Sequence, residues 1–201
     1  MSTPEAHPIT TPTPVFPGLE MIWVHPSNIR THPEPIRWSV ETTPAGELLI
    51  LESGDGLISA TFTESAQRDL ERWKETHPGQ TLIPQVTSWI STEDNHDSVP
   101  PTPIRISLSG TPFQLDVWRT LLEIPWGETR TYGWIAERIG RPKACRAVGS
   151  AVGNNPIALL VPCHRVLPST GHAGNYAGGQ HRKIALLTWE GYENFKSAGA
   201  S

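Results

Sequence analysis

The chain of 201 residues lacks the features that mark several common protein classes. It has two cysteines, Cys145 and Cys163, and no CxxC pair, which excludes a disulfide framework and a cysteine zinc site. No stretch approaches the roughly 20 apolar residues of a membrane span, and the N-terminus lacks a basic start followed by an apolar run. We therefore expect an intracellular protein with reduced thiols, no membrane partner, no metal and no cofactor.

The composition indicates a small core accompanied by unstructured chain. Apolar residues make up 37% of the sequence, which is lean, and eight prolines fall within the first 35 residues. The length fits one or two small domains. We predict a Pro-rich flexible tail over 1–35, an N-terminal domain over 36–109, a second domain over 110–192 and a tail over 193–201.

Charge is unevenly distributed between the two halves. Residues 1–110 hold 6 Lys and Arg against 14 Asp and Glu, whereas residues 111–201 hold 10 against 6. The window 130–183 contains one acidic residue and eight basic ones: Arg130, Arg138, Arg141, Lys143, Arg146, Arg165, Arg182 and Lys183. From charge alone, an anion-binding face and a solvated basic face are equally open interpretations.

The first half has the pattern of a small α+β unit. Residues rich in β-branched and apolar side chains alternate with Gly-containing turns. The pattern predicts strands over 38–43, 47–52, 57–62 and 104–108, a helix over 65–75, and a long polar connection over 76–103. We find no candidate catalytic residue in this half.

The second half is typical of a mainly helical unit. Thr111 followed by Pro112 predicts a helix start. Thr131 can cap a second helix over 132–139, which Gly140 ends. Pro142 is expected to open a third helix that reaches about residue 152.

These last two helices have the pattern of a helix-turn-helix. Helix pairs of this length are also common in protein cores, so the pattern alone is a moderate signal. We expect the second helix to carry Lys143 and Arg146, within the strongly basic window. The combination favours nucleic-acid binding over a purely structural helix pair.

A candidate nucleophile follows these helices. The apolar run 157–161 predicts a short buried strand, after which come Cys163, His164 and Arg165. A lone cysteine is more often a small buried hydrophobe. Because neighbouring positive charge lowers the pKa of a thiol, the flanking residues favour a reactive cysteine here.

At this point the sequence closely resembles the 6-O-alkylguanine-DNA alkyltransferases, the methylated-DNA–protein-cysteine methyltransferases. The resemblance runs from about residue 110 to 191 and rests on several short motifs in the same order and at the same spacing. These are GTPFQ (110–114), RAVG (146–149), NP (155–156), PCHRV (162–166), NYAGG (175–179) and WEG (189–191). It implies an α+β fold, in which a small N-terminal α/β domain precedes a mostly helical DNA-binding and active-site domain with a helix-turn-helix.

The resemblance implies a set of catalytic roles. Cys163 corresponds to the alkyl acceptor, and His164 to the base that takes its proton through a water. Glu190 resembles the carboxylate that orients this imidazole, following the usual logic of an activated nucleophile. Asn155 is similar to the residue that braces the active-site turn, and Tyr132 to the tyrosine that hydrogen-bonds the departing guanine.

It also implies residues that bind the substrate. Arg146 resembles the arginine finger that fills the gap left by the extruded nucleotide, and Lys183 a lysine at the pocket mouth. Val166 and Tyr176 fall where the family lines the guanine pocket. Ala177 stands where some members have serine, and its backbone N–H remains available to the alkylated oxygen. We group three further residues with the DNA-binding set: Lys143, Ala147 and Arg165.

The implied function is direct reversal of DNA damage. An alkyl group would pass irreversibly from O6 of guanine, and from O4 of thymine, in double-stranded DNA to Cys163. The thioether product has no good leaving group, so each protein molecule would act once, on a nucleotide flipped out of the duplex. We expect a monomer, in the cytoplasm or nucleoid if bacterial and in the nucleus if eukaryotic. Whether several copies bind DNA side by side stays open.

Two other functions compete with this one. A lesion-sensing DNA-binding protein without transfer is disfavoured because such relatives carry tryptophan where this chain has Cys163. A cysteine hydrolase using Cys163 and His164 would leave the basic helix pair without a role, and such enzymes usually bring their histidine from a distant part of the chain. We interpret Cys145 as a small structural residue.

Overall fold

A computed structural model describes residues 21–24, 34–85 and 104–194 of the chain. These residues form two compact units, and the boundary between them falls between Ser109 and Gly110. In the described ranges, no helix combines the length and apolar character needed to cross a bilayer.

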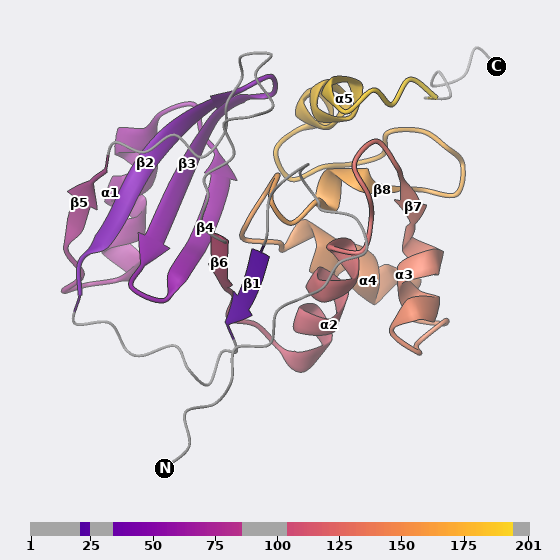
Figure 1. The fold of residues 1–201 in the computed structure, drawn as a ribbon, viewed down its shortest axis with the longest axis horizontal. Coiled ribbons are helices and arrows are strands. Elements are labelled where there is room, and N and C mark those ends of the chain that lie inside the picture. The colour runs from indigo at the N-terminus through magenta and orange to yellow at the C-terminus, as the bar shows by residue number, and fades with distance from the viewer. Residues whose placement is uncertain (1–20, 25–33, 86–103, 195–201) are drawn as a thin grey trace. The chain divides into compact units, whose positions relative to one another are not determined.

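The first unit is a mixed sheet with one helix (Figure 1). Its described strands lie in the order β1-β6-β4-β3-β2-β5. The central strands β2, β3 and β4 are antiparallel, and the β1–β6, β4–β6 and β2–β5 pairs are parallel. The elements are β1 (Met21–Val24), β2 (Ile36–Thr43), β3 (Gly46–Ser53), β4 (Gly56–Phe62), α1 (Ala66–Thr76), β5 (Leu82–Pro84) and β6 (Ile104–Ser107).

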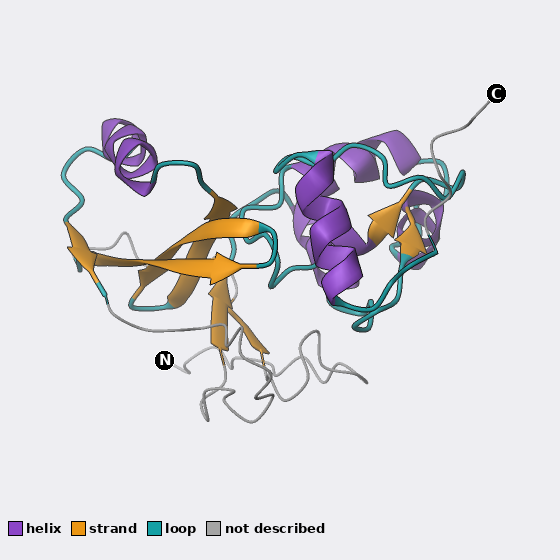
Figure 2. Cartoon of the chain, turned by 90° about the horizontal axis from the view of Figure 1, so that it is seen from above, coloured by secondary structure: helices purple, strands orange, loops and turns teal. Residues whose placement is uncertain are grey.

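Helix α1 covers one face of this sheet (Figure 2). Leu70 of the helix packs against Ile36, Leu49 and Leu51, which are almost fully buried. Ser65 caps the helix by accepting a hydrogen bond from the backbone N–H of Arg68. The strands predicted over 38–43, 47–52, 57–62 and 104–108 and the helix predicted over 65–75 are confirmed to within a few residues.

Two short strands of this unit differ from the sequence-based expectation. Strand β1 lies inside the segment predicted as a flexible tail, because its four-residue apolar run can pair in parallel with β6. Strand β5 lies inside the segment predicted as an irregular connection and pairs in parallel with β2. Neither segment is long enough to show the alternation of a strand in its sequence. Each is recognised as a strand only from its pairing with β6 or β2.

The second unit is mainly helical, as predicted, and builds the site (Figure 2). Its elements are α2 (Pro112–Leu121), β7 (Arg130–Thr131), α3 (Tyr132–Arg138), α4 (Cys145–Gly153), a 3-10 helix η2 (Cys163–Arg165), β8 (Val166–Leu167) and α5 (Gln180–Trp189). Helix α4 packs against both α2 and α3. The indole Nε1–H of Trp118 donates to the backbone carbonyl of Ala151 at 2.9 Å, which joins α2 to α4 in the core.

The predicted helix starts at Thr111 and Thr131 are confirmed. Thr111 and Gln114 form a reciprocal capping box at the start of α2. The Thr131 side chain accepts from the backbone N–H of Trp134 at 3.1 Å, and Gly140, with a φ of 69°, follows the end of α3.

The third helix begins later than the sequence predicts. A backbone hydrogen bond of 2.9 Å from Ala144 to the carbonyl of Arg141 closes a turn at residues 141–144, and α4 starts at Cys145 rather than at Pro142. Lys143 therefore lies in the turn of the helix pair and not on its second helix. Because α4 has no side-chain cap, the sequence carried no signal for this start.

Candidate active site

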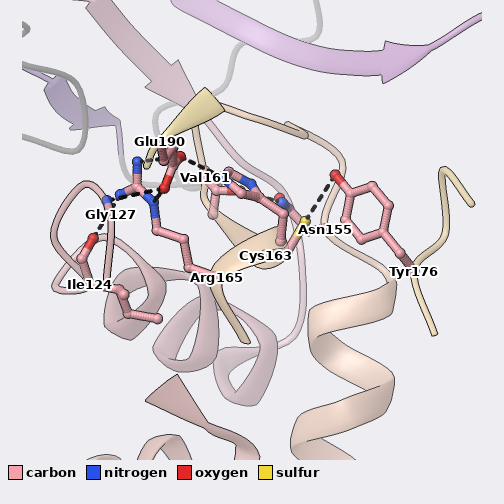
Figure 3. Close-up of polar contacts among 9 residues, drawn as sticks. Ile124, Gly127, Asn155, Val161, Cys163, Arg165, Tyr176 and Glu190 are labelled. Atoms are coloured by element: carbon pink, nitrogen blue, oxygen red, sulfur yellow. Dashed lines mark hydrogen bonds and ion pairs between the residues drawn. The ribbon is translucent and has the colours of Figure 1, made fainter. Parts of the chain in front are cut away.

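Cys163 lies at the start of η2, directly after a braced turn (Figure 3). The side-chain amide of Asn155 donates to the carbonyls of Ile157 at 3.2 Å and Val161 at 2.8 Å, and its Oδ1 accepts from the Ile157 N–H at 3.1 Å. These three bonds satisfy backbone groups that no regular element pairs. The turn that these bonds stabilise places Cys163 in the interior, where only 6% of its surface is accessible to solvent.

The prediction of a strand over 157–161 is wrong, whereas the prediction that this segment is buried is confirmed. Ile157, Leu159, Leu160 and Val161 are buried, but the segment is a tight turn. The Val161 N–H bonds the Ile157 carbonyl at 3.0 Å, and Leu159 takes a φ of 69°. A short apolar run does not distinguish a strand from a buried turn. Here the neighbouring Asn155 side chain supplies the partners that a second strand would have provided.

Burial raises the pKa of the Cys163 thiol above its ordinary value. Hydrogen bonds from Asn155 and Tyr176 and the charge of Lys183 lower the pKa, but desolvation is the larger effect. The expectation that flanking His and Arg side chains would lower this pKa is therefore wrong in its net direction. The thiol is protonated at neutral pH and needs a base.

His164, the residue after Cys163, forms a buried pair with Glu190. The His164 Nε2 lies 2.7 Å from Oε1 of Glu190, and both side chains are inaccessible to solvent. Burial lowers the pKa of His164, although Glu190 opposes that effect. The other ring nitrogen, Nδ1, is buried and has no hydrogen-bond partner within the described residues. A neutral imidazole with a free nitrogen is what a general base requires.

Arg165 occupies the opposite side of the same carboxylate (Figure 3). Its Nε lies 2.8 Å from Oε2 of Glu190, and its Nη1 donates to the carbonyl of Ile124 at 2.7 Å. Arg165 was grouped with the DNA-binding residues. In the structure its side chain is fully buried, and its guanidinium contacts Glu190 and the carbonyl of Ile124.

Lys183 and Val166 are also joined in the interior. The ammonium of Lys183, on α5, donates to the backbone carbonyl of Val166 at 2.6 Å, and both residues are buried. Burial lowers the pKa of Lys183 to about 8, while the nearby Cys163 opposes the shift. Lys183 was predicted at the pocket mouth. In the structure its side chain is buried, and its charge acts on the thiol.

Two tyrosines lie near the thiol. The hydroxyl of Tyr176 lies 3.9 Å from Sγ of Cys163, and Tyr132, at the start of α3, is close enough that the charge of Cys163 raises its pKa. Burial is the main cause of the raised pKa of both phenols. Both hydroxyls therefore keep their protons at neutral pH. The adjacent Ala177 is exposed.

The remaining predicted residues lie on the surface of the helix pair. Arg146 and Ala147, in the first turn of α4, are exposed, as is Lys143 in the preceding turn. They are therefore accessible to a large partner, whereas Cys163 is not. Cys145 is also exposed, and its Sγ lies 3.7 Å from the carbonyl of Pro142. No group of three or more His, Cys, Asp or Glu side chains that could hold a metal ion occurs in the described part of the chain.

Sequence reasoning missed the turn at residues 124–127. It contributes the carbonyl of Ile124 to Arg165 and the N–H of Gly127 to Oε2 of Glu190, at 3.3 Å. The only sequence signal was the Pro125-Trp126-Gly127 string, which predicted a break after a helix and nothing about the carboxylate it meets.

The fold and the site together define a protein with a buried cysteine, a buried histidine–carboxylate pair that starts at the next residue and a helix-turn-helix in the same unit. The family described as "6-O-methylguanine DNA methyltransferase, DNA binding domain" matches residues 112–192.

Comparison with known proteins identifies the family. A methylated-DNA–protein-cysteine methyltransferase of Mycobacterium bovis is 39% identical over 157 residues, which cover 77% of this chain and 92% of the relative. A crystal structure of the Mycobacterium tuberculosis OGT protein in complex with DNA is similar at 37% identity, with a TM-score of 0.60, over 78% of this chain and 92% of that one. The O6-methylguanine-DNA methyltransferase of Pyrococcus kodakaraensis, at 24% identity and a TM-score of 0.54, shares the fold. The chain belongs to the methylated-DNA–protein-cysteine methyltransferase family.

The bracing role of Asn155 leads to a stability prediction. Asn155→Asp keeps the acceptor for the Ile157 N–H but removes both donated bonds and places a charge against two carbonyls. We expect the free energy of unfolding to fall by about 1–3 kcal/mol. The matched control, Asn154→Asp, adds the same charge at an exposed neighbouring position and should cost about 0.5 kcal/mol. Denaturant titration of both variants checks this, and equal losses would contradict the bracing role.

Proposed function

We propose that the protein repairs alkylated DNA by transferring the alkyl group from O6 of guanine, and from O4 of thymine, to Sγ of Cys163. The observation that carries this proposal is a buried thiol followed directly in the chain by a buried histidine, whose Nδ1 has no partner in the described residues and whose Nε2 contacts Glu190. Membership of the methyltransferase family and the likeness to a relative solved with DNA support the substrate class.

The first step is activation of the thiol. Because burial keeps Cys163 protonated, a base must remove the proton before attack. We infer that Nδ1 of His164 accepts it through a water, and that the resulting imidazolium is stabilised by the carboxylate of Glu190, 2.7 Å from Nε2. This division between a base and its orienting carboxylate is common in nucleophilic catalysis.

The second step is an in-line displacement at the alkyl carbon. Sγ forms a bond to this carbon while the carbon–oxygen bond breaks. The electron pair of the broken bond passes to the oxygen of the departing guanine or thymine. Guanine leaves more readily if its developing charge is neutralised. Tyr132 keeps its proton because its pKa is raised, so it can donate to the departing base. We place Tyr176, Ala177 and the Val166 backbone along the base-binding pocket.

The reaction ends with a thioether on Cys163. A thioether carbon has no good leaving group, so no second step regenerates the thiol. Each molecule would therefore carry out one transfer, and the protein is a reagent consumed in stoichiometric amounts.

Access to the target requires base flipping. The thiol is buried and the alkylated oxygen lies inside the base stack, so the nucleotide must leave the duplex, at a cost of a few kcal/mol. Arg146 is exposed on α4 and can fill the vacated space, which offsets part of this cost. Lys143, exposed in the turn, and Ala147 complete the surface that we propose faces DNA.

The site of transfer can be tested by mass spectrometry. After incubation with duplex DNA containing O6-methylguanine, a tryptic digest should yield the peptide of residues 147–165 with one added methyl on Cys163. The variant Cys163→Ser should bind the same DNA and leave both the peptide and the lesion unchanged. Repair with an unmodified peptide would refute the proposal, and tight lesion binding without any repair would identify a lesion-sensing protein.

The role of Arg146 predicts a difference between two substrates. Arg146→Ala should slow transfer from duplex DNA by about 10-fold or more, because no side chain then occupies the gap that the flipped nucleotide leaves. Transfer from the free base O6-methylguanine should change by less than about twofold. Arg68→Ala removes an exposed arginine from α1 and serves as the charge control. Single-turnover rates on both substrates check this, and equal losses on the two would remove the finger role.

A further inference from the structure

We propose that Arg165, held by the turn at residues 124–127, is a positioning residue that keeps Glu190 ionised and thereby keeps the proton of His164 on Nε2. The inference rests on the proposed function, because it concerns how the base for Cys163 is prepared. Neither the resemblance nor the sequence assigned Arg165 this task.

The guanidinium of Arg165 contacts both oxygens of Glu190. Its Nε lies 3.1 Å from Oε1 and 2.8 Å from Oε2, and its Nη2 lies 2.9 Å from Oε1. All of these atoms belong to fully buried side chains. Charge-assisted bonds of this forked kind fix the orientation of a carboxylate as well as its charge.

The turn at residues 124–127 holds the other side of both groups (Figure 3). The Ile124 carbonyl accepts from Nη1 of Arg165 at 2.7 Å, and the guanidinium lies 5.5 Å from the ring of Trp126. The N–H of Gly127 donates to Oε2 of Glu190 at 3.3 Å. Gly127 has a φ of 73°, and a Cβ there would lie 2.9 Å from the backbone carbonyl of Glu190, so this approach requires glycine.

The consequence for His164 follows from donor and acceptor counting. Glu190 receives donors from Arg165 and Gly127 on both oxygens, and an ionised carboxylate can only accept. The pKa of Glu190 is lowered by the His164 and Arg165 bonds despite burial, which agrees with this state. The 2.7 Å contact then requires a hydrogen on Nε2 of His164. In the neutral ring, Nδ1 is left as the acceptor.

The charges around His164 determine when it can act as a base. Glu190, beyond the end of α5, favours the imidazolium, whereas Arg165 on η2 and Lys183 on α5 disfavour it together with burial. Removing Arg165 would take a positive charge away from both groups, so the His164–Glu190 pair would take up a further proton at higher pH. That proton would occupy Nδ1 and block acceptance from the thiol.

The test is the pH dependence of the single-turnover transfer rate with saturating methylated duplex DNA. In Arg165→Met, the acid limb of the profile should move to higher pH by about one unit or more. Arg165→Lys retains a cation and should keep the limb within about 0.5 unit of the unmodified protein. The matched control is Arg37→Met, which removes an arginine that pairs with Glu52 at 3.1 Å in the first unit, and it should leave the profile unchanged.

A merely structural role would lower the melting temperature of Arg165→Met without moving the limb, and that result would overturn the inference. If Arg165→Met does not fold, the protonation of the two His164 ring nitrogens can be measured by ¹⁵N NMR in the unmodified protein. His164 should carry its proton on Nε2 alone over about pH 5–8, and a proton on Nδ1 in that range would overturn it. Absence of alkyl transfer in the unmodified protein would instead refute the proposed function.

Discussion

The buried ion pair between Arg165 and Glu190 is the interaction on which the rest of the site depends. It joins η2, the end of α5 and the turn at residues 124–127, which are distant in the sequence. A pair of this kind adds little net stability compared with apolar packing, but removing one partner leaves a buried charge and costs about 3–5 kcal/mol. Its benefit is geometric, because Arg165 contacts both oxygens of Glu190 and Gly127 contacts Oε2, which holds Oε1 against Nε2 of His164.

A second constraint is the burial of Cys163 itself. Exclusion of water raises the pKa of the thiol, so in the free protein it is a weak nucleophile. Under the proposed single transfer this is an advantage, since premature alkylation or oxidation would consume the protein. In the proposed mechanism, His164 generates the thiolate where the substrate is bound. Cys145, which is exposed, has no such arrangement.

Much of this structure could be predicted from the sequence where local chemistry determines the outcome. Thr111 and Thr131 start helices because their hydroxyls can cap them, and the alternating residues of β2, β3 and β4 form strands between Gly-containing turns. The PCHRV and WEG strings led us to expect Cys163, His164 and Glu190 in one site, and the structure brings His164 and Glu190 into contact.

Prediction failed where a residue's role depends on a distant partner. Nothing near Arg165 indicates that its guanidinium points inward to Glu190, 25 residues away in the sequence, rather than outward to phosphate. The run 157–161 has the hydrophobicity of a strand, but its own backbone bond from Val161 to Ile157 and the three Asn155 bonds make it a turn. Likewise, nothing near Lys183 in the sequence indicates that its ammonium donates to the carbonyl of Val166, 17 residues away.

The central claim is that the protein is a reagent consumed by a single transfer to Cys163. The most direct measurement is the amount of O6-methylguanine removed from excess duplex DNA, plotted against the amount of protein added. A single transfer per molecule predicts a straight line with a slope of one lesion per chain, and this slope does not increase however long the incubation lasts. Continued removal beyond one lesion per chain would show that the thiol is regenerated and would contradict the account.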